Sequence, residues 1–330
     1  MASRCRSRET VAVRDSLLDN EDTASGGPKS DTRTVIVRDL LTDSSLDLHI
    51  EVLQGQDGLD NEIRSPRIQK LGMVLTGYAG DIHPDRVQIL GGSESYHLKS
   101  LSLEERNEAI HRLKKHNICC IVITKSLDVP EELLRVSGEA KIPLLRSSAS
   151  SSVSIHRLSS YLEKRLAPRM TVHGVLIEIF GLGVLLLGPS GIGKSECALE
   201  LVLKGHRLIT DDYVELSRRG IDRILGSCGE VLKHHMELRG LGIINVKELF
   251  GISATSVSKI VDFAVRLERW NPEAEYDRLG LDQDSIDFLG ISIPLVAMPV
   301  APGRNVATLV EVAARIHLLR QRGYRPSIQQ

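Results

Sequence analysis

The sequence has few of the residues that form disulfide frameworks or aromatic cores. Aromatic residues make up only 3% of the 330 residues, so the core must be built from Leu, Ile, Val and Ala. No Cys-x-x-Cys pair occurs, which argues against a disulfide framework and against a four-cysteine zinc site. We expect reduced thiols, as in a cytoplasmic protein, at all five cysteines: Cys5, Cys119, Cys120, Cys197 and Cys228.

An excess of charge of one sign and a long hydrophobic run are also lacking. The 42 basic residues against 43 acidic ones give a net charge of −1, whereas a nucleic-acid-binding protein normally carries a basic excess. The longest apolar region, Val175–Leu187, is interrupted by charged and glycine residues and is shorter than the roughly 20 residues of a membrane-spanning helix. No apolar segment follows the basic N-terminus, so no secretory signal is indicated. We therefore expect a cytoplasmic protein that binds neither nucleic acid nor membrane.

Length and local composition predict two domains preceded by a tail. Residues 1–32 are polar and offer too little apolar surface to order, so we expect a disordered tail there. Residues 33–162 should form an N-terminal α/β domain, and residues 163–330 a second domain.

In the N-terminal domain, helices and strands alternate along the chain, which indicates an α/β fold with a parallel sheet. Ser102 and Glu105 have the capping-box pattern at the start of a helix. The expected elements are a strand at 34–37, a helix at 101–116, a buried strand at 118–124, a helix at 130–137 and a strand at 143–145. The serine-rich residues 147–154 are predicted as a loop, and residues 155–166 as a helix that leads to the second domain.

A phosphate-binding loop lies in the second domain. A strand at 172–180, a tight turn at 181–183 and an apolar strand at 184–187 precede it, and a helix at 196–204 follows, which is the context that the G-x-x-x-x-G-K-[ST] motif requires. Glycines let successive backbone N–H groups face one anion, the Lys supplies a cation for the β- and γ-phosphates, and the Ser hydroxyl can reach Mg²⁺. The nucleotide-binding residues are therefore expected to be Gly188, Pro189, Ser190, Gly191, Ile192, Gly193, Lys194 and Ser195.

Two carboxylates follow the helix of this loop. The segment Arg207–Asp212 is predicted as a strand beside the phosphate-loop strand, and it ends in Asp211 and Asp212. One carboxylate can then face the γ-phosphate and its metal, and the other an incoming hydroxyl whose proton it accepts. The chain has no Asn-Lys-x-Asp motif of GTPases and no Leu-Ser-Gly-Gly-Gln segment of transporter ATPases, which argues against both classes.

Five segments in this order resemble the bacterial HPr kinase/phosphorylase family: Val172–Val175, Gly188–Glu196, Gly205–Asp212, Met236–Val246 and Ala301–Asn305. The resemblance implies an α/β fold with an N-terminal Mur-ligase-like α/β domain and a C-terminal P-loop kinase domain similar to the phosphoenolpyruvate carboxykinase core. It also implies an enzyme that phosphorylates a serine of the phosphocarrier protein HPr with ATP. The reverse reaction in the family is a phosphorolysis that yields pyrophosphate, and the pair of activities regulates carbon metabolism and the sugar phosphotransferase system.

The resemblance also assigns roles to individual positions. Catalytic residues are implied at His173, Lys194, Asp212 and Arg278, with Asp212 as the base that accepts the serine proton and returns it in the reverse reaction. Magnesium ligands are implied at Ser195 and Glu237. The segment important for both reactions consists of Met236, Glu237, Leu238, Arg239, Gly240, Leu241, Gly242, Ile243, Ile244 and Asn245. The loop linked mainly to dephosphorylation consists of Pro299, Val300, Ala301, Pro302, Gly303 and Arg304.

The implied cofactor is Mg²⁺ and the implied phosphoryl donor is ATP, with phosphate and pyrophosphate in the reverse direction. HPr is the implied partner, and the family implies a homohexamer. Two alternatives stay open: a small-molecule kinase or carboxykinase with the same core, and a non-catalytic ATP-binding sensor. A sensor would need none of Asp212, Arg278 and Arg304.

The last helix is expected at Val306–Gln321, with Asn305 as its N-cap and Gly323 as its stop. We expect most of its regularly spaced apolar residues to lie in the core, and a subunit interface is the alternative for them: Leu309, Val312, Ala313, Ile316 and Leu319.

Overall fold

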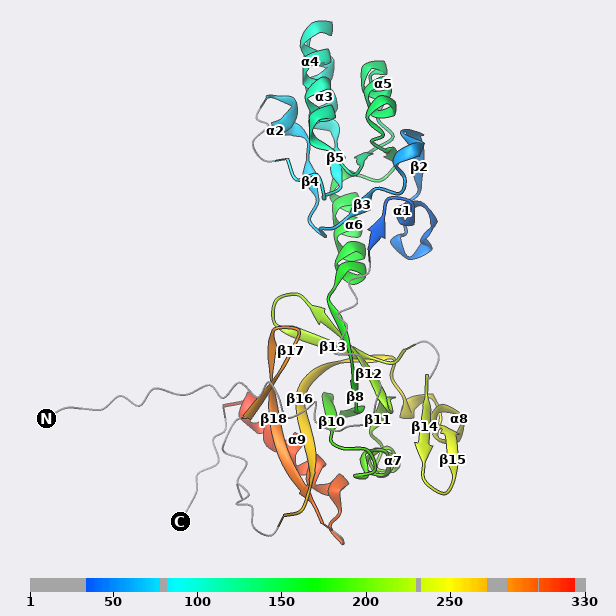
Figure 1. Ribbon diagram of the computed structural model, residues 1–330, viewed down its shortest axis with the longest axis vertical. Helices are drawn as coiled ribbons and strands as arrows, with labels where there is room; N and C mark the ends of the chain where they lie inside the picture. Colours follow the sequence, from blue (N-terminus) through cyan, green and yellow to red (C-terminus); the bar gives the residue numbers. More distant parts are fainter. Residues whose placement is uncertain (1–33, 78–81, 230–232, 272–283, 302, 324–330) are drawn as a thin grey trace, which may run out of the picture.

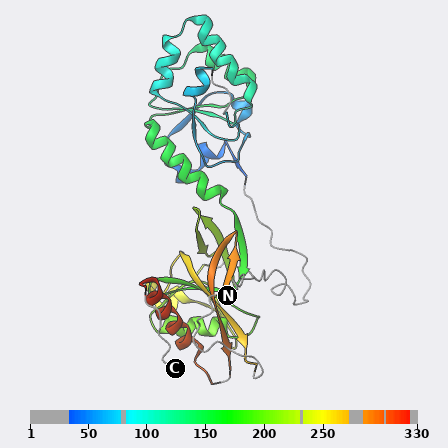
Figure 2. The ribbon, with the colours of Figure 1, turned by 90° about the vertical axis from the view of Figure 1, so that its left-hand side faces the viewer.

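The computed structural model describes residues 34–77, 82–229, 233–271, 284–301 and 303–323 and places them in two lobes (Figure 1). The long helix α6 (Ser151–Leu166) packs on the first lobe and leads directly into strand β8 (Arg169–His173) of the second. Figure 2 shows the same connection from the side. Both lobes combine helices with sheets, so the α/β fold class is confirmed. The tail predicted at residues 1–32 lies outside the described residues.

A five-stranded sheet with the order β2-β7-β6-β5-β4 forms the first lobe. Its four strands from β4 to β7 are parallel, as predicted, but β2 joins one edge antiparallel to β7 and makes the sheet mixed. The strands are β2 (Ile50–Gln54), β4 (Gln69–Lys70), β5 (Gln88–Leu90), β6 (Ile121–Ile123) and β7 (Leu144–Ser147). A separate antiparallel pair consists of β1 (Val35–Ile36) and β3 (Glu62–Ile63).

Apolar residues of the central strands alternate between two cores, because successive side chains of a strand point to opposite faces. Val122 shares a core with Leu158 and Leu162 of α6, whereas Ile121 and Ile123 share the other core with α4 and α5. The remaining helices are α1 (Asp39–Thr42), α2 (Gly72–Leu75), α3 (Gly92–Ser100), α4 (Leu103–Leu113) and α5 (Glu131–Ala140).

The sequence predicted the start of α4 correctly and the start of α6 too late in the chain. Ser102 and Glu105 form the predicted capping box at α4, with bonds of 3.3 Å from the Glu105 N–H to the Ser102 hydroxyl and 2.9 Å from the Ser102 N–H to the Glu105 carboxylate. The loop predicted at residues 147–154 is wrong in its second half, because α6 begins at Ser151. The Ser150 hydroxyl caps that helix by accepting a hydrogen bond from the Val153 N–H, so the loop ends at this serine.

A nine-stranded sheet forms the second lobe, with the order β11-β9-β10-β16-β13-β12-β8 along its main path. The twelve-residue strand β16 pairs with β13 at one end and with β10 and β18 at the other, and β17 pairs with β18. The strands are β9 (Val175–Ile179), β10 (Leu182–Leu187), β11 (Arg207–Thr210), β12 (Tyr213–Arg219), β13 (Arg223–Ser227), β16 (Ser258–Arg269), β17 (Asp284–Phe288) and β18 (Ile291–Val300).

Two features of this sheet correct the sequence-based expectations. The single strand predicted at 172–180 is divided at Gly174 into β8 and β9, which pair with different neighbours. A side chain at Gly174 would lie 2.7 Å from the Leu186 carbonyl oxygen, so the chain passes too close to β10 there for any larger residue. Strand β11 lies beside β9 rather than beside the phosphate-loop strand β10, because the β9–β10 hairpin occupies that edge of β10.

Helices α7 (Lys194–Leu203) and α9 (Val306–Gln321) share one core of the second lobe with β9, β10 and β16. The limits of α9 and its Asn305 cap, which accepts from the Thr308 N–H at 2.7 Å, are as predicted. The core assignment on α9 is wrong for four of its five residues, because 36–46% of the surface is exposed at Leu309, Val312, Ile316 and Leu319. The fifth, Ala313, is partly buried and packs against the core, and the buried residues of the helix are Ala307, Val310 and Ala314.

A small hairpin and helix complete the second lobe. Strands β14 (His235–Leu238) and β15 (Gly242–Asn245) pair with each other alone, and α8 (Val246–Phe250) follows them (Figure 1). Met236 and Leu238 of β14 are buried in the same core as α7, which fixes the hairpin against the phosphate loop. Among the residues described, no helix is long and apolar enough to cross a membrane.

Candidate active site

The phosphate-binding loop connects a fully buried strand to a helix. All six residues of β10 are buried, and α7 begins at Lys194. Between them the loop turns through three glycines with positive φ, which are Gly188 (145°), Gly191 (76°) and Gly193 (103°). Residues with a side chain rarely adopt such angles, so the motif's glycines allow the backbone path that aims N–H groups at one anion.

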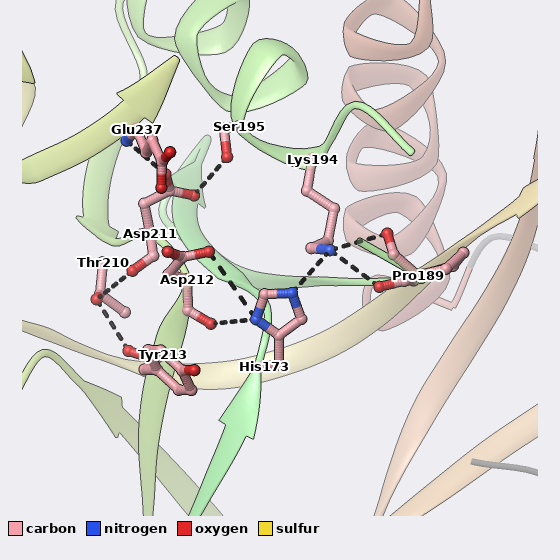
Figure 3. Close-up of polar contacts among 10 residues, drawn as sticks. His173, Pro189, Lys194, Ser195, Thr210, Asp211, Asp212, Tyr213 and Glu237 are labelled. Carbon is pink, nitrogen blue, oxygen red and sulfur yellow. Dashed lines mark hydrogen bonds and ion pairs between the residues drawn. The ribbon is translucent and has the colours of Figure 1, made fainter. Parts of the chain in front are cut away.

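Lys194 is buried and its ammonium group is fully occupied. The Nζ donates to the carbonyl oxygens of Gly188 at 2.9 Å and Pro189 at 3.1 Å, and it lies 3.3 Å from Nε2 of His173 (Figure 3). Burial lowers the pKa of Lys194, an effect that Asp212 and Asp211 oppose. Because an ammonium group has three hydrogens, phosphate can bind Lys194 only by replacing one of these partners.

His173 connects Lys194 to Asp212. Since the ammonium group of Lys194 has only donors, the Nε2 of His173 must accept, and the hydrogen-bond network therefore assigns the ring hydrogen to Nδ1. That Nδ1–H donates to the backbone oxygen of Asp212 at 2.9 Å, and the Asp212 carboxylate lies 3.9 Å away. The Gly174 N–H donates to the same oxygen at 2.9 Å. These bonds hold Asp212 at a φ of 71°, an angle uncommon for a residue with a side chain.

Asp211 connects the phosphate loop to the β14–β15 hairpin. Its Oδ1 accepts a 3.0 Å hydrogen bond from the Ser195 hydroxyl, and its Oδ2 accepts one of 3.2 Å from the Glu237 N–H. Only 5% of Asp211 is exposed, and burial raises its pKa from 3.8 to about 6. The sequence predicted that one of the two carboxylates faces the metal, but it did not say which one. The apolar residues Leu208 and Ile209 are the signal that favours Asp211, because they bury the end of the strand that carries this carboxylate.

The oxygen atoms around Ser195 fit the chemistry of Mg²⁺. The Ser195 hydroxyl and the Asp211 carboxylate are in contact, and the exposed Glu237 is joined to Asp211 through its backbone (Figure 3). Within the described part of the chain, no three His, Cys, Asp or Glu side chains are grouped closely enough to hold a metal ion. Mg²⁺ commonly uses one or two carboxylates, with substrate phosphates and water as its other ligands, so a sparse oxygen set of this kind suits it.

The loop expected to act in dephosphorylation lies at the end of β18. Trp270 donates from its backbone N–H to the Val300 oxygen at 3.1 Å, and the guanidinium of Arg304 stacks over the Trp270 ring at 4.9 Å. Arg304 thus contacts Trp270, and no contact described joins it to the phosphate loop. Arg278 and Pro302 lie outside the described residues.

Cys197 lies on α7 two residues after Ser195. It is buried in the core, and burial raises its pKa to about 12. The thiol therefore packs as a small apolar group.

Comparison with known proteins relates both lobes to one family. The family model described as "HPr Serine kinase N terminus" matches residues 35–162, and "HPr Serine kinase C-terminal domain" matches residues 164–329. An HPr kinase/phosphorylase of Geobacter sulfurreducens is 45% identical over 291 residues, covering 88% of this chain and 91% of its own length. The protein of the same name from Bacillus cereus strain AH820 is 41% identical over 275 residues, covering 83% and 89%.

A solved structure also matches part of the chain. The Hpr(Ser) kinase/phosphatase from Coxiella burnetii is 33% identical, with a TM-score of 0.44, and the match covers 47% of this chain and 93% of that one.

Proposed function

This chain belongs to the HPr serine kinase family, and on that premise we propose that it is an ATP-dependent protein-serine kinase and phosphorylase acting on HPr. The observation that carries the proposal is the position of Asp212. It directly follows Asp211, which bonds the phosphate-loop Ser195, and His173 connects it to Lys194. A base thus stands beside the place where the γ-phosphate would bind.

In the kinase direction, a serine hydroxyl of HPr attacks the γ-phosphorus of ATP. The new bond joins the serine oxygen to phosphorus, the bond to the β,γ-bridging oxygen breaks, and ADP leaves. Asp212 accepts the serine proton as this happens, since a neutral hydroxyl is a poor nucleophile. Lys194 exchanges a loop carbonyl for a phosphate oxygen, and its charge offsets the negative charge on the transferred group.

In the phosphorylase direction, an oxygen of inorganic phosphate attacks the phosphorus of phosphoserine. The bond between phosphorus and the serine oxygen breaks, pyrophosphate forms, and protonated Asp212 returns its proton to the serine oxygen. The same loop serves both directions because its N–H groups bind phosphate, pyrophosphate and ATP by the same chemistry.

We further propose Ser195 and Glu237 as magnesium ligands, together with Asp211. Mg²⁺ held there would neutralise phosphate charge and orient the γ-phosphate. The Ser195–Asp211 bond supports this role, because it gathers two oxygen ligands at the loop. We also retain Arg278 as a catalytic residue and Arg304 as a phosphate-facing residue of the dephosphorylation loop.

The finer architecture follows from the family. We propose a domain of residues 33–162 related to Mur-ligase domains and a catalytic domain of residues 163–330 related to the phosphoenolpyruvate carboxykinase core. We also propose a cytoplasmic homohexamer. The exposed apolar side chains of α9 support an assembly, because contact with another copy would remove them from water. Light scattering of the purified chain measures the molar mass of the assembly and so tests the proposed homohexamer.

One assay separates the proposal from a small-molecule kinase and from an ATP sensor. The purified chain is incubated with HPr, Mg²⁺ and ATP, and phosphoserine is followed on intact HPr by mass spectrometry. Phosphate is then added and pyrophosphate is measured. We expect phosphoserine in the first stage and its loss with pyrophosphate formation in the second. Failure to form phosphoserine, at low and at high phosphate, would refute the proposal.

A further inference from the structure

Arg239 lies directly against the phosphate-binding loop. It follows β14 in the turn of the β14–β15 hairpin, and its guanidinium fills the space beside Gly191. A methyl group placed on Gly191 would lie 2.3 Å from Nη2 and 3.0 Å from Cζ of Arg239. Strand alternation places Arg239 on the same face of the hairpin as Glu237, whose N–H bonds Asp211. One short hairpin therefore reaches both the loop and the proposed metal ligands.

The donors of Arg239 are available for a ligand. The residue is exposed, and no hydrogen bond or ion pair joins it to another of the residues described. Lys194 differs, because its three donors are used by two carbonyl oxygens and His173. A guanidinium group at a cluster of backbone N–H groups is well suited to phosphate, which it can bind through two parallel hydrogen bonds.

The charges around the loop also favour a further cation. Asp211, Asp212 and Glu237 bring three carboxylates to this region, against the single positive charge of Lys194. These charges sum to −2, and one Mg²⁺ would bring the sum only to zero, so a polyphosphate would meet no net positive charge in such a site. Arg239 supplies a positive charge on the open side of the loop, where it does not compete with the buried Lys194.

We propose that Arg239 binds the β- or γ-phosphate of the nucleotide, and the corresponding oxygens of pyrophosphate, from the tip of the β14–β15 hairpin. The inference rests on the proposed function for the identity of the anion. It gives a physical reason for the importance that the family resemblance implies for the segment from Met236 to Asn245, because β14 presents Glu237 to Asp211 and the turn presents Arg239 to the loop.

Isothermal titration with pyrophosphate at fixed Mg²⁺ tests this role without HPr and without turnover. We expect Arg239→Ala to weaken pyrophosphate binding about 10- to 100-fold, as for loss of a charge-assisted hydrogen-bonded pair. Arg239→Lys keeps the charge but loses the planar fork, so its affinity for pyrophosphate should lie between that of the wild type and that of Arg239→Ala. The salt dependence of binding should also become shallower in Arg239→Ala, since one charge fewer faces the anion.

Lys247→Ala is the matched control, because it removes one exposed positive charge from α8 of the same hairpin–helix unit. Its affinity for pyrophosphate should stay within about twofold of the wild-type value. Equal affinities of Arg239→Ala and Lys247→Ala would overturn the role of Arg239 and leave the proposed function intact. A wild-type chain that binds neither pyrophosphate nor ATP would contradict the proposed function, and the role of Arg239 with it.

Discussion

The Ser195 hydroxyl donates a 3.0 Å hydrogen bond to Oδ1 of Asp211, a carboxylate of which only 5% is exposed. Two donors, the Ser195 hydroxyl and the Glu237 N–H, do not compensate for the water that Asp211 loses, and burial keeps its pKa near 6. At neutral pH the chain thus holds a buried negative charge beside the phosphate loop. Such a charge is costly for folding and useful for binding a cation.

Asp211→Asn should therefore stabilise the ligand-free protein while removing its activity. Because the folded-state pKa of about 6 lies above the ordinary 3.8, the free energy of unfolding falls as pH rises through this window, and the deficit persists above it. We expect the variant to gain about 1 to 3 kcal/mol at pH 7.5. Asparagine can still donate to Ser195 and accept from the Glu237 N–H, so the fold should be kept.

Thermal unfolding at several pH values measures this effect. The melting temperature of Asp211→Asn should exceed that of the wild type at pH 7.5, and the difference should shrink toward pH 4. Addition of Mg²⁺ with ATP should raise the melting temperature of the wild type and leave the variant almost unchanged. A variant less stable than the wild type at pH 7.5 would show that the ionised carboxylate stabilises the fold.

Two substitutions of His173 separate the contacts of its two ring nitrogens. Asparagine places an amide near the position of Nδ1, so His173→Asn can still bond the Asp212 oxygen but loses Lys194. Glutamine reaches toward the position of Nε2, so His173→Gln can still accept from Lys194. We expect His173→Asn mainly to change the KM for ATP, and His173→Gln to lower kcat about 10- to 100-fold through a misplaced Asp212.

Steady-state kinetics with intact HPr gives both constants for each variant. If the two substitutions change KM and kcat alike, His173 acts as a single catalytic group rather than as a positioning residue with two separate contacts.

Local signals in the sequence were sufficient for features that depend on a few neighbouring residues. The capping box of Ser102 and Glu105, the start of α9 after Asn305 and the phosphate loop between β10 and α7 all follow from short-range geometry. The order of β11, β9 and β10 does not follow from short-range geometry. The same local sequence of β11 would allow it to pair with either strand of the β9–β10 hairpin. The face of α9 was equally hidden. The helix carries apolar residues nearly all round, so its periodicity cannot tell the buried Val310 from the exposed Ile316.

The candidate site was predicted in part for the same reason. The motif identifies Lys194 and Ser195 because their roles depend on the loop itself. The contact of Asp211 with Glu237, and that of Arg239 with Gly191, join segments far apart in the sequence through the burial of Met236 and Leu238. No spacing rule encodes these contacts, and they arise only when the hairpin packs on α7.

Asp212→Asn should abolish both directions of phosphoryl transfer and leave nucleotide binding almost unchanged. Asparagine cannot take the serine proton, and loss of a general base typically costs about 10²- to 10⁴-fold in rate. It tolerates the φ of 71° better than most residues, so the backbone should be kept. Phosphoserine formation, pyrophosphate release and ATP affinity are measured on the same preparation. Asp222→Asn, in the exposed turn between β12 and β13, is the matched control. Full activity of Asp212→Asn would show that another group is the base.

Arg304→Gln should reduce phosphorolysis more than phosphorylation and change the fluorescence of Trp270, the only tryptophan in the chain. Arg304 stacks on this ring at 4.9 Å, so its loss alters the surroundings of the indole directly. We expect phosphorolysis to fall about tenfold or more, because a charge that would meet incoming phosphate is removed. Arg315→Ala is the control, since it removes an arginine that stacks on Phe180 instead. An equal loss in both directions would assign Arg304 to the shared phosphate site rather than to the reverse reaction, and an unchanged emission spectrum would show that the stacked arrangement is not held in solution.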